Sequence, residues 1–372
     1  MLSLFLAVGL LGACSDDGAS PQPDGWVTDA VGVEAGSEAG SEAGIDAGVD
    51  GVVVPHKAIG LTLAHMNDTH AQIEPTETNL KLADKDTSVL LGGFTRWVTK
   101  IKDLRTTAKN LLVLHAGDAF QGTLYFQKFL GMADLEFFKM MPLDAMVVGN
   151  HEFDRGPKVL ADFVKTAKGT FPVLGGNVDA SKDPDLKDQL LPYIIKEIDG
   201  EKVAIIGLVT PDVSTTSSPG KNITFADHIA RAKVLVKEVE GKGVNKVILL
   251  THVGYEEDLK LAQGVEGVDV ILGGHTHSTV MGDSTELAKF QANVKYGGLD
   301  LTPSSAYPKK VQGPGGKDVC IAHSWALTRA LGLLNVDFDK EGFVTQCVGH
   351  PVMVVGDAFA RFNPTTKKVE PV

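Results

Sequence analysis

The sequence predicts an α/β sandwich in which helices pack on the outside of the sheets. From residue 57 onward, short apolar runs alternate with segments of helical spacing, and this alternation is typical of α/β domains. After residue 282 the helical segments stop, and short strands with turn signals such as Gly313-Pro314-Gly315-Gly316 follow. We expect this later part to form a meander that packs as a second sheet on the first.

The individual elements follow from the spacing of apolar residues. Six short runs rich in Val, Ile or Leu are expected to be strands, and they cover residues 59–66, 111–115, 145–148, 202–208, 247–250 and 268–272. Helices are expected over residues 93–108, 124–140, 157–168, 226–239 and 256–263. The strands of the meander are expected over residues 290–296, 309–312, 319–323, 331–337 and 344–348.

Residues 1–14 are predicted to be an export signal of the lipoprotein type. The apolar run over residues 2–11 is too short to span a bilayer. It leads into Leu11-Gly12-Ala13-Cys14-Ser15, which resembles the bacterial lipobox, in which the cysteine becomes the lipidated first residue of the mature protein. The alternative is an ordinary cleaved signal peptide. The lipoprotein interpretation predicts that the protein is anchored by its lipid to a bacterial membrane, in the periplasm or at the cell surface.

Residues 15–56 are expected to be a disordered acidic tether, rich in Gly, Ala, Ser and Glu. Residues 1–56 contain nine acidic residues and no Lys or Arg, and they offer few large apolar side chains to offset the entropy of ordering. Without these nine residues the chain carries 38 acidic and 35 basic residues. The remaining domain, residues 57–372, is thus nearly neutral, and we expect it not to bind a nucleic-acid duplex.

Two cysteines remain if Cys14 is lipidated. Cys320 and Cys347 lie in predicted strands that could be antiparallel neighbours. In an oxidising compartment they form either a disulfide or two free buried thiols.

Five polar segments follow predicted strands, and they carry side chains that bind metals or transfer protons. Parallel strands bring such segments to one edge of a sheet, where oxygen and imidazole donors suit a hydrolytic metal pair. The segments are Asn67-Asp68-Thr69-His70, Gly117-Asp118, Gly149-Asn150-His151-Glu152-Phe153-Asp154, Thr251-His252 and Gly273-Gly274-His275-Thr276-His277.

Taken singly, most of these segments have ordinary alternatives. Asp68 and His70 would suit a surface pair as well as a metal half-site, and Asp118 would suit a helix N-cap as well as a bridge between cations. The segment over residues 149–154 is the most specific. Asn150 offers a carbonyl oxygen to a metal, His151 can donate a proton, and Asp154 can hold the other ring nitrogen of that histidine. A structural role is expected for Glu152.

In their order along the chain, these segments resemble the signature of the calcineurin-like metallophosphoesterase superfamily, and specifically its 5'-nucleotidase branch. Gly92-Gly93-Phe94-Thr95-Arg96 is a further close match, and the resemblance covers residues 59–356. It implies a four-layer α/β/β/α sandwich with two packed mixed sheets. It also implies two divalent cations (Mn, Zn, Fe or Co), which activate a bridging hydroxide for attack on phosphorus.

The resemblance also implies roles for particular residues. His151 would be the proton donor, and Asp154 its partner. Asn150 would also contact the substrate. Apart from the resemblance, Arg155 follows Asp154 and could contact a phosphate, and a salt bridge at the start of a helix is an equal alternative. The ligands of one cation would be Asp68, His70, Asp118 and His277, and those of the other Asp118, Asn150, His252 and His275.

The resemblance therefore implies an exported enzyme that hydrolyses small phosphate monoesters, above all 5'-nucleotides. The alternatives are a 2',3'-cyclic-nucleotide phosphodiesterase or another ester hydrolase of the family, and a non-catalytic binding lipoprotein on the same fold. Members of the branch usually continue into a second domain that stacks the nucleobase. The sequence ends at Val372 without one, so little discrimination among bases is expected.

Overall fold

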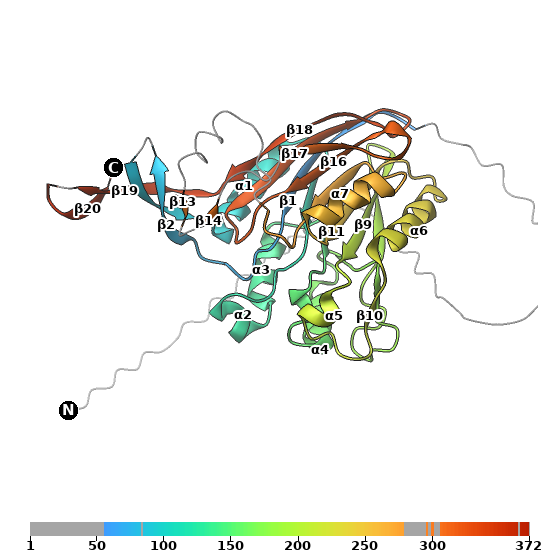
Figure 1. The fold of residues 1–372 in the computed structure, drawn as a ribbon, viewed down its shortest axis with the longest axis horizontal. Coiled ribbons are helices and arrows are strands. Elements are labelled where there is room, and N and C mark those ends of the chain that lie inside the picture. The colour runs from blue at the N-terminus through green and yellow to red at the C-terminus, as the bar shows by residue number, and fades with distance from the viewer. Residues whose placement is uncertain are drawn as a thin grey trace, which may run out of the picture. The chain divides into compact units, whose positions relative to one another are not determined.

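Two six-stranded sheets form the centre of the fold in this computed structural model (Figure 1), which describes residues 56–82, 85–278, 295–296, 299–300, 306–363 and 365–371. The first sheet has the order β18 (Val344–Met353), β17 (Ala330–Phe338), β1 (Ile59–Met66), β4 (Leu111–His115), β5 (Ala145–Val147) and β6 (Val173–Leu174). The second has the order β15 (Lys309–Gln312), β16 (Asp318–His323), β12 (Val270–Gly273), β11 (Val247–His252), β9 (Glu201–Val209) and β8 (Tyr193–Ile198).

The two sheets pack face to face through side chains that alternate along their strands. One buried apolar cluster contains residues of both sheets, among them Leu63, Leu114, Ile205 and Leu250. Strands β1, β4, β5 and β6 are parallel, as are β9, β11, β12 and β16. Each sheet is mixed. In the first sheet β17 runs antiparallel to both β1 and β18, and in the second sheet β15 runs antiparallel to β16 and β8 to β9. The carboxyl ends of the parallel strands meet at one edge of each sheet.

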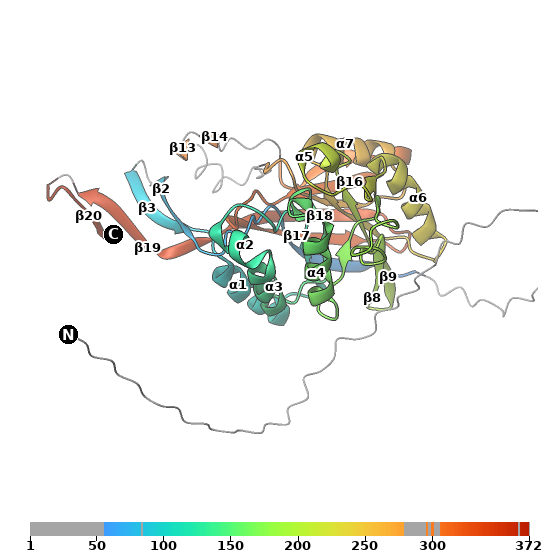
Figure 2. The ribbon, with the colours of Figure 1, turned by 90° about the horizontal axis from the view of Figure 1, so that it is seen from below.

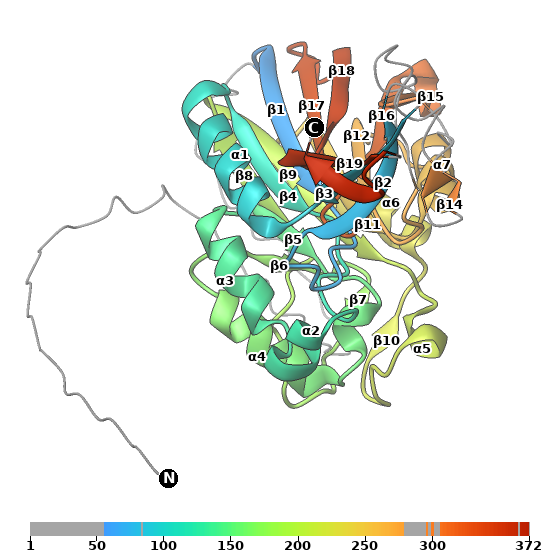
Figure 3. The same cartoon turned by 90° about the vertical axis from the view of Figure 1, so that its left-hand side faces the viewer.

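Helices cover the outer face of each sheet, and Figures 2 and 3 show the two groups on opposite sides. The first sheet packs against α1 (Phe94–Thr107), α3 (Met132–Met140) and α4 (Pro157–Ala167). The second packs against α6 (His228–Glu240) and α7 (Tyr255–Gly264). Shorter helices are α2 (Leu124–Phe129), α5 (Val213–Thr216), η1 (His151–Phe153) and η2 (Pro314–Gly316). The predicted four-layer sandwich is confirmed.

The prediction of one helix over residues 124–140 is wrong, because this segment forms two helices, α2 and α3. Leu130 and Gly131 between them have φ angles of 50° and 86°, and a Cβ on Gly131 would collide with the Phe120 ring. The left-handed backbone at these two positions ends α2 and sets the start of α3.

The prediction that the later strands form a sheet of their own is also wrong. Strands β15 and β16 extend the second sheet, whereas β17 and β18 extend the first. In Figure 1 the red β17 accordingly lies beside the blue β1. Of the expected strand over residues 290–296, only β13 (Lys295–Tyr296) lies within the described residues, and it pairs with β14 (Leu299–Asp300).

Small sheets complete the fold. One has the order β2 (Thr76–Leu82), β3 (Lys85–Leu91), β19 (Val355–Asn363) and β20 (Lys368–Pro371), and β7 (Val178–Asp179) pairs with β10 (Thr224–Phe225). These strands are short or largely polar, so the spacing of apolar residues does not reveal them. Within the described residues no helix has the length and hydrophobicity needed to cross a membrane. The predicted signal peptide and residues 15–55 of the predicted tether lie outside the described residues.

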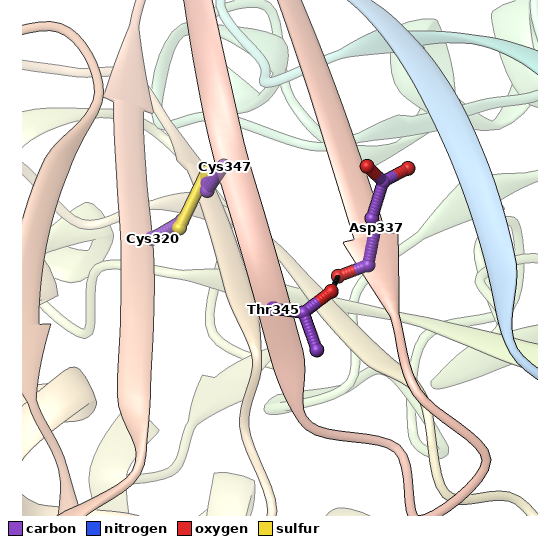
Figure 4. The surroundings of a disulfide bond; sticks show 4 residues. All are labelled: Cys320, Asp337, Thr345 and Cys347. Atoms are coloured by element: carbon purple, nitrogen blue, oxygen red, sulfur yellow. Dashed lines mark hydrogen bonds between the residues drawn. A yellow bond between two sulfur atoms is a disulfide. The ribbon is translucent and has the colours of Figure 1, made fainter.

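A disulfide between Cys320 and Cys347 joins the two central sheets (Figure 4). Cys320 lies in β16 and Cys347 in β18, and their Cα atoms are 6.6 Å apart. The two strands belong to different sheets, so the expectation that they are antiparallel neighbours is wrong. The pair is connected across the apolar layer between the sheets, in which both cysteines are buried.

Candidate metal centre

The seven predicted metal ligands lie together at the carboxyl ends of the central parallel strands. Three segments of the first sheet carry Asp68 and His70 after β1, Asp118 after β4 and Asn150 after β5. The second sheet contributes His252 at the end of β11, and His275 and His277 after β12. The site is therefore divided between the two sheets.

Asp68, His70 and His277 form one group whose ligand atoms lie within 4.8 Å of one another. The Nε2 atom of His277 is 3.4 Å from Oδ1 of Asp68 and 2.9 Å from Nε2 of His70. His70 Nε2 is 4.0 Å from the same carboxylate oxygen of Asp68. These three residues are among the ligands expected for one cation.

Asp118, His252 and His275 form a second group within the same limit. The Nε2 atom of His252 is 3.0 Å from Oδ2 of Asp118, and Nδ1 of His275 is 2.9 Å from the side-chain oxygen of Asn150. Asp118 lies between the two groups, because its Oδ2 is also 4.0 Å from Nε2 of His70. A position next to both groups is what a bridging carboxylate requires.

The donor atoms at this edge fit a divalent cation. Backbone carbonyls of Phe120 and Ala116 lie 3.2 Å from Nδ1 of His70 and 2.7 Å from Nδ1 of His252, which assigns the ring proton to Nδ1 in both histidines. Their Nε2 atoms then face the carboxylates and are the atoms that would bind a cation. The Nε2 atom of His252 is buried and, within the described residues, has no partner in hydrogen-bond geometry. Buried imidazole nitrogens beside carboxylate oxygens suit Mn, Zn, Fe or Co.

The electrostatics of the site also favour bound positive charge. Burial lowers the pKa of His252, but the carboxylates of Asp118 and Asp68 outweigh it and raise this pKa to about 10. For Asp118 the directions are reversed. Burial raises its pKa, but His252 and His70 outweigh burial, so the pKa of Asp118 is lowered overall. Two ionised carboxylates in a buried site stabilise a positive charge in their midst.

Five of the candidate ligands have a left-handed backbone, which non-glycine residues rarely adopt. The φ angles lie between 47° and 82°, at Asp68, His70, Asp118, His275 and His277. Each such residue costs on the order of 1 kcal/mol, which the surrounding structure must offset. Close backbone approach helps to fix these turns, since a Cβ on Gly117 would lie 2.8 Å from the backbone nitrogen of Gly149.

Glu152 holds the Asp118 turn against η1. Its buried carboxylate accepts hydrogen bonds from the backbone N–H groups of Asp118, Ala119 and Phe120 at 2.9, 2.8 and 3.0 Å, and from that of Gly149 at 2.5 Å. Burial, followed by the charge of Asp118, raises the pKa of Glu152 to about 7. These contacts account for the structural role expected for this residue.

Asn67 fixes the Asp68 carboxylate, a role that the sequence did not indicate. Its side-chain amide donates to Oδ2 of Asp68 at 2.6 Å and to the carbonyl of Trp325. Its oxygen accepts from the backbone N–H and the hydroxyl of Ser324 at 2.9 and 2.7 Å. Ser324 and Trp325 are 257 and 258 residues away in the sequence, so no local pattern reveals these contacts.

A buried polar network lies behind the histidine loops of the second sheet. Nε2 of His323 is 2.7 Å from Oδ2 of Asp258, whose other oxygen accepts from the hydroxyl of Thr251 at 2.7 Å. All three side chains are fully buried. A Cβ on Gly273 would collide with this network, so a glycine is required where β12 leads into the His275 loop. The sequence indicated no role for Asp258 or His323.

His151 and Asp154 form the expected pair. Nδ1 of His151 is 2.7 Å from Oδ2 of Asp154, and the hydroxyl of Ser217 donates to the other Asp154 oxygen at 2.6 Å. Burial lowers the pKa of His151, but the hydrogen bond to Asp154 and the charge of Asp118 raise it overall. The Nε2 atom of His151 lies 4.0 Å from Oδ2 of Asp118, on the inner side of the site. Ser217 is a further contributor that the sequence did not indicate.

Arg155 makes no hydrogen bond or ion pair with other described residues, so the predicted salt bridge at the start of a helix is not found. It lines a pocket of about 460 Å³ beside Asp154. A guanidinium in this position is available to a ligand.

The chain is similar in sequence to a known protein family and to individual members of it. The sequence profile of the calcineurin-like phosphoesterase family matches residues 61–279. The chain is 39% identical over 301 residues to the NAD 5'-nucleotidase of Haemophilus influenzae, covering 80% of this chain and 48% of that one. It is 38% identical over 292 residues to a probable 5'-nucleotidase of Treponema pallidum, covering 78% and 47% of the two chains.

A solved structure gives the same relationship in three dimensions. The 5'-nucleotidase precursor of Thermus thermophilus aligns with a TM-score of 0.71 and 42% identity, over 80% of this chain and 55% of that one. The chain thus spans about half the length of these relatives. The residues that match the family profile, 61–279, contain every candidate ligand described above.

Proposed function

Because this chain belongs to the calcineurin-like phosphoesterase family, we propose that it is a metal-dependent hydrolase of phosphate monoesters, with 5'-nucleotides as its main substrates. The observation that carries the proposal is the convergence of the ligand groups with the His151–Asp154 pair at the carboxyl ends of parallel strands from both sheets. The relatives named as 5'-nucleotidases supply the substrate class. A 2',3'-cyclic-nucleotide phosphodiesterase is the alternative that uses the same residues.

In this proposal the site binds two divalent cations. One is held by Asp68, His70, Asp118 and His277, and the other by Asp118, Asn150, His252 and His275. Bound there, the cations supply Lewis-acid activation of the phosphoryl oxygens and of a water molecule. The donor set of oxygens and imidazoles is the reason for expecting Mn, Zn, Fe or Co.

The protein's own contribution to the chemistry is the handling of a proton. The proton on Nε2 of His151 passes to the oxygen of the departing alcohol as the ester bond breaks. Asp154 keeps Nδ1 protonated and the ring oriented, because its Oδ2 accepts from that nitrogen. Ser217 restrains Asp154 in turn. The side-chain amide of Asn150 lies beside these groups and would contact the substrate phosphate.

The proposal predicts that the activity depends strictly on metal. Purified protein should hydrolyse 4-nitrophenyl phosphate and AMP, lose this activity on exhaustive chelation, and regain it when Mn²⁺, Zn²⁺, Co²⁺ or Fe²⁺ is added singly. Phosphate release and metal content are the measurements, with 2',3'-cyclic AMP in parallel. Full turnover after chelation would refute the two-metal mechanism. Nucleotide binding without any turnover would favour the non-catalytic alternative.

We further propose that the protein is exported and tethered to a bacterial membrane through Cys14. The sequence Leu11-Gly12-Ala13-Cys14-Ser15 supports this, and so does the word precursor in the name of the Thermus thermophilus relative. Cys14→Ser should move the protein from the membrane fraction to the soluble fraction of a bacterial host, as judged by immunoblotting. Ser20→Ala, a matched change in the tether, should leave it in the membrane fraction. A Cys14→Ser protein that stays there would require another anchor.

A further inference from the structure

The pocket beside Arg155, hereafter the Arg155 pocket, lies next to the candidate site and has no role in the chemistry described so far. It has a volume of about 460 Å³. Three chain segments line it: residues 121–127 after the Asp118 turn, Asp154 and Arg155 after η1, and residues 215–218 at the end of α5.

Its place in the fold is on the proton-donor side of the site. Asp154 forms part of the wall and holds His151 through the 2.7 Å contact to Nδ1. Gly122, another lining residue, packs closely against His70, because a Cβ on Gly122 would lie 3.0 Å from the His70 Cβ. The His70 and His151 rings are themselves 5.3 Å apart, edge to face. The pocket therefore adjoins both the proposed proton donor, through Asp154, and the predicted metal ligand His70, through Gly122.

The polar groups of the pocket that remain available are mainly hydrogen-bond donors. Asp154 is the carboxylate in its wall, and both of its oxygens already accept hydrogen bonds, from His151 and Ser217. The hydroxyls of Thr215 and Thr216 donate to the backbone carbonyl of Asp212.

Four polar side chains of the wall are left for a ligand, and one of them is the small hydroxyl of Ser218. The guanidinium of Arg155 and the amides of Gln121 and Gln127 make no hydrogen bond with other described residues. A free guanidinium with two free amides, and no carboxylate with a free oxygen, suits an anionic ligand with many hydrogen-bond acceptors. Phosphate is such a ligand, because two of its oxygens can accept the paired N–H groups of an arginine.

We propose that the Arg155 pocket binds a second phosphate group carried by the leaving alcohol. The substrates favoured by this subsite are phosphate monoesters of an alcohol that is itself phosphorylated, such as nucleoside 3',5'-bisphosphates. The inference rests on the proposed function, since it takes the reacting phosphate to lie at the metal centre. It assigns Arg155 to the leaving group and not to the phosphate that reacts.

The test compares adenosine 3',5'-bisphosphate with AMP, which differ only in the second phosphate. The wild-type chain should favour the bisphosphate about tenfold in kcat/KM, mostly through KM, because one charge-assisted contact of about 1.4 kcal/mol corresponds to that factor. Arg155→Ala should bring the ratio of the two kcat/KM values close to one. Arg155→Lys should give an intermediate ratio, since it keeps the charge and loses the fork. Gln127→Leu should lower the ratio as well.

Lys158→Ala is the matched control. It removes an exposed cation three residues from Arg155, and its Nζ is paired with Asp162 at 3.0 Å, outside the pocket. If the preference came from general positive charge, Lys158→Ala would reduce the ratio too. We expect it to leave the ratio unchanged.

Two results would overturn the assignment. One is equal kcat/KM for both nucleotides in the wild type. The other is an Arg155→Ala protein that loses activity equally on both, which would place Arg155 on the reacting phosphate. Equilibrium binding of the bisphosphate to the full chain, wild type against Arg155→Ala, separates this inference from the proposed function. A chain without turnover still tests the pocket, through an affinity about tenfold lower in the variant or an affinity that does not change.

Discussion

Replacing His151 with alanine should lower kcat for 4-nitrophenyl phosphate or AMP by roughly 10²–10⁴-fold, the usual contribution of a positioned proton donor. Metal content should stay the same, because His151 is held by Asp154 and belongs to neither proposed ligand set. Steady-state kinetics and elemental analysis of the same preparation measure the two quantities. His350→Ala, a change at an exposed histidine of β18, should alter neither.

The same experiment distinguishes a proton donor from a ligand. His151 also lies in a group with His70 and Asp118 whose atoms are within 4.8 Å of one another. A His151→Ala protein that loses metal together with activity would therefore make His151 a ligand and contradict its assignment as the donor.

Asp118→Asn should abolish both metal binding and turnover. The amide keeps the shape of the side chain but removes the charge from the oxygen that lies 3.0 Å from His252 and 4.0 Å from His70. We expect metal affinity to fall by more than the roughly 10–100-fold typical of outer partners of a metal site, because Asp118 adjoins both ligand groups.

Titration with Zn²⁺ or Mn²⁺ measures that loss, and circular dichroism checks the fold. Asp103→Asn is the matched control, since Asp103 is an exposed partner of Lys100 on α1 and such pairs contribute little. An Asp118→Asn protein with normal metal content and rate would refute the bridging role.

The sequence correctly predicted the strands that carry the candidate metal ligands. Strands β1 and β4 begin and end where predicted, because each is a continuous apolar run that stops at a polar turn. The turns carry Asp68, His70 and Asp118, so finding the strand ends amounted to finding the ligands. The order of the segments along the chain then supplied the resemblance.

Other features depend on contacts that no local pattern contains. Asn67 meets Ser324, and Ser217 meets Asp154, across gaps of 257 and 63 residues. The left-handed backbone of the ligand turns also costs free energy, which the surrounding tertiary structure has to offset. Strands β15 to β18 were predicted, but their division between two sheets depends on which neighbours they pair with, and β19 and β20 were not predicted.

The division of the ligands between the two sheets has a thermodynamic consequence. A cation that binds this arrangement, and not the unfolded chain, stabilises the folded state by RT ln(1 + [L]/Kd), about 2.7 kcal/mol at one hundred times the dissociation constant. Because Asp68 and Asp118 come from one sheet and His252 and His275 from the other, that energy resists separation of the sheets. The Cys320–Cys347 disulfide resists the same separation covalently. The supply of metal would thus influence how long the protein persists as well as how fast it works.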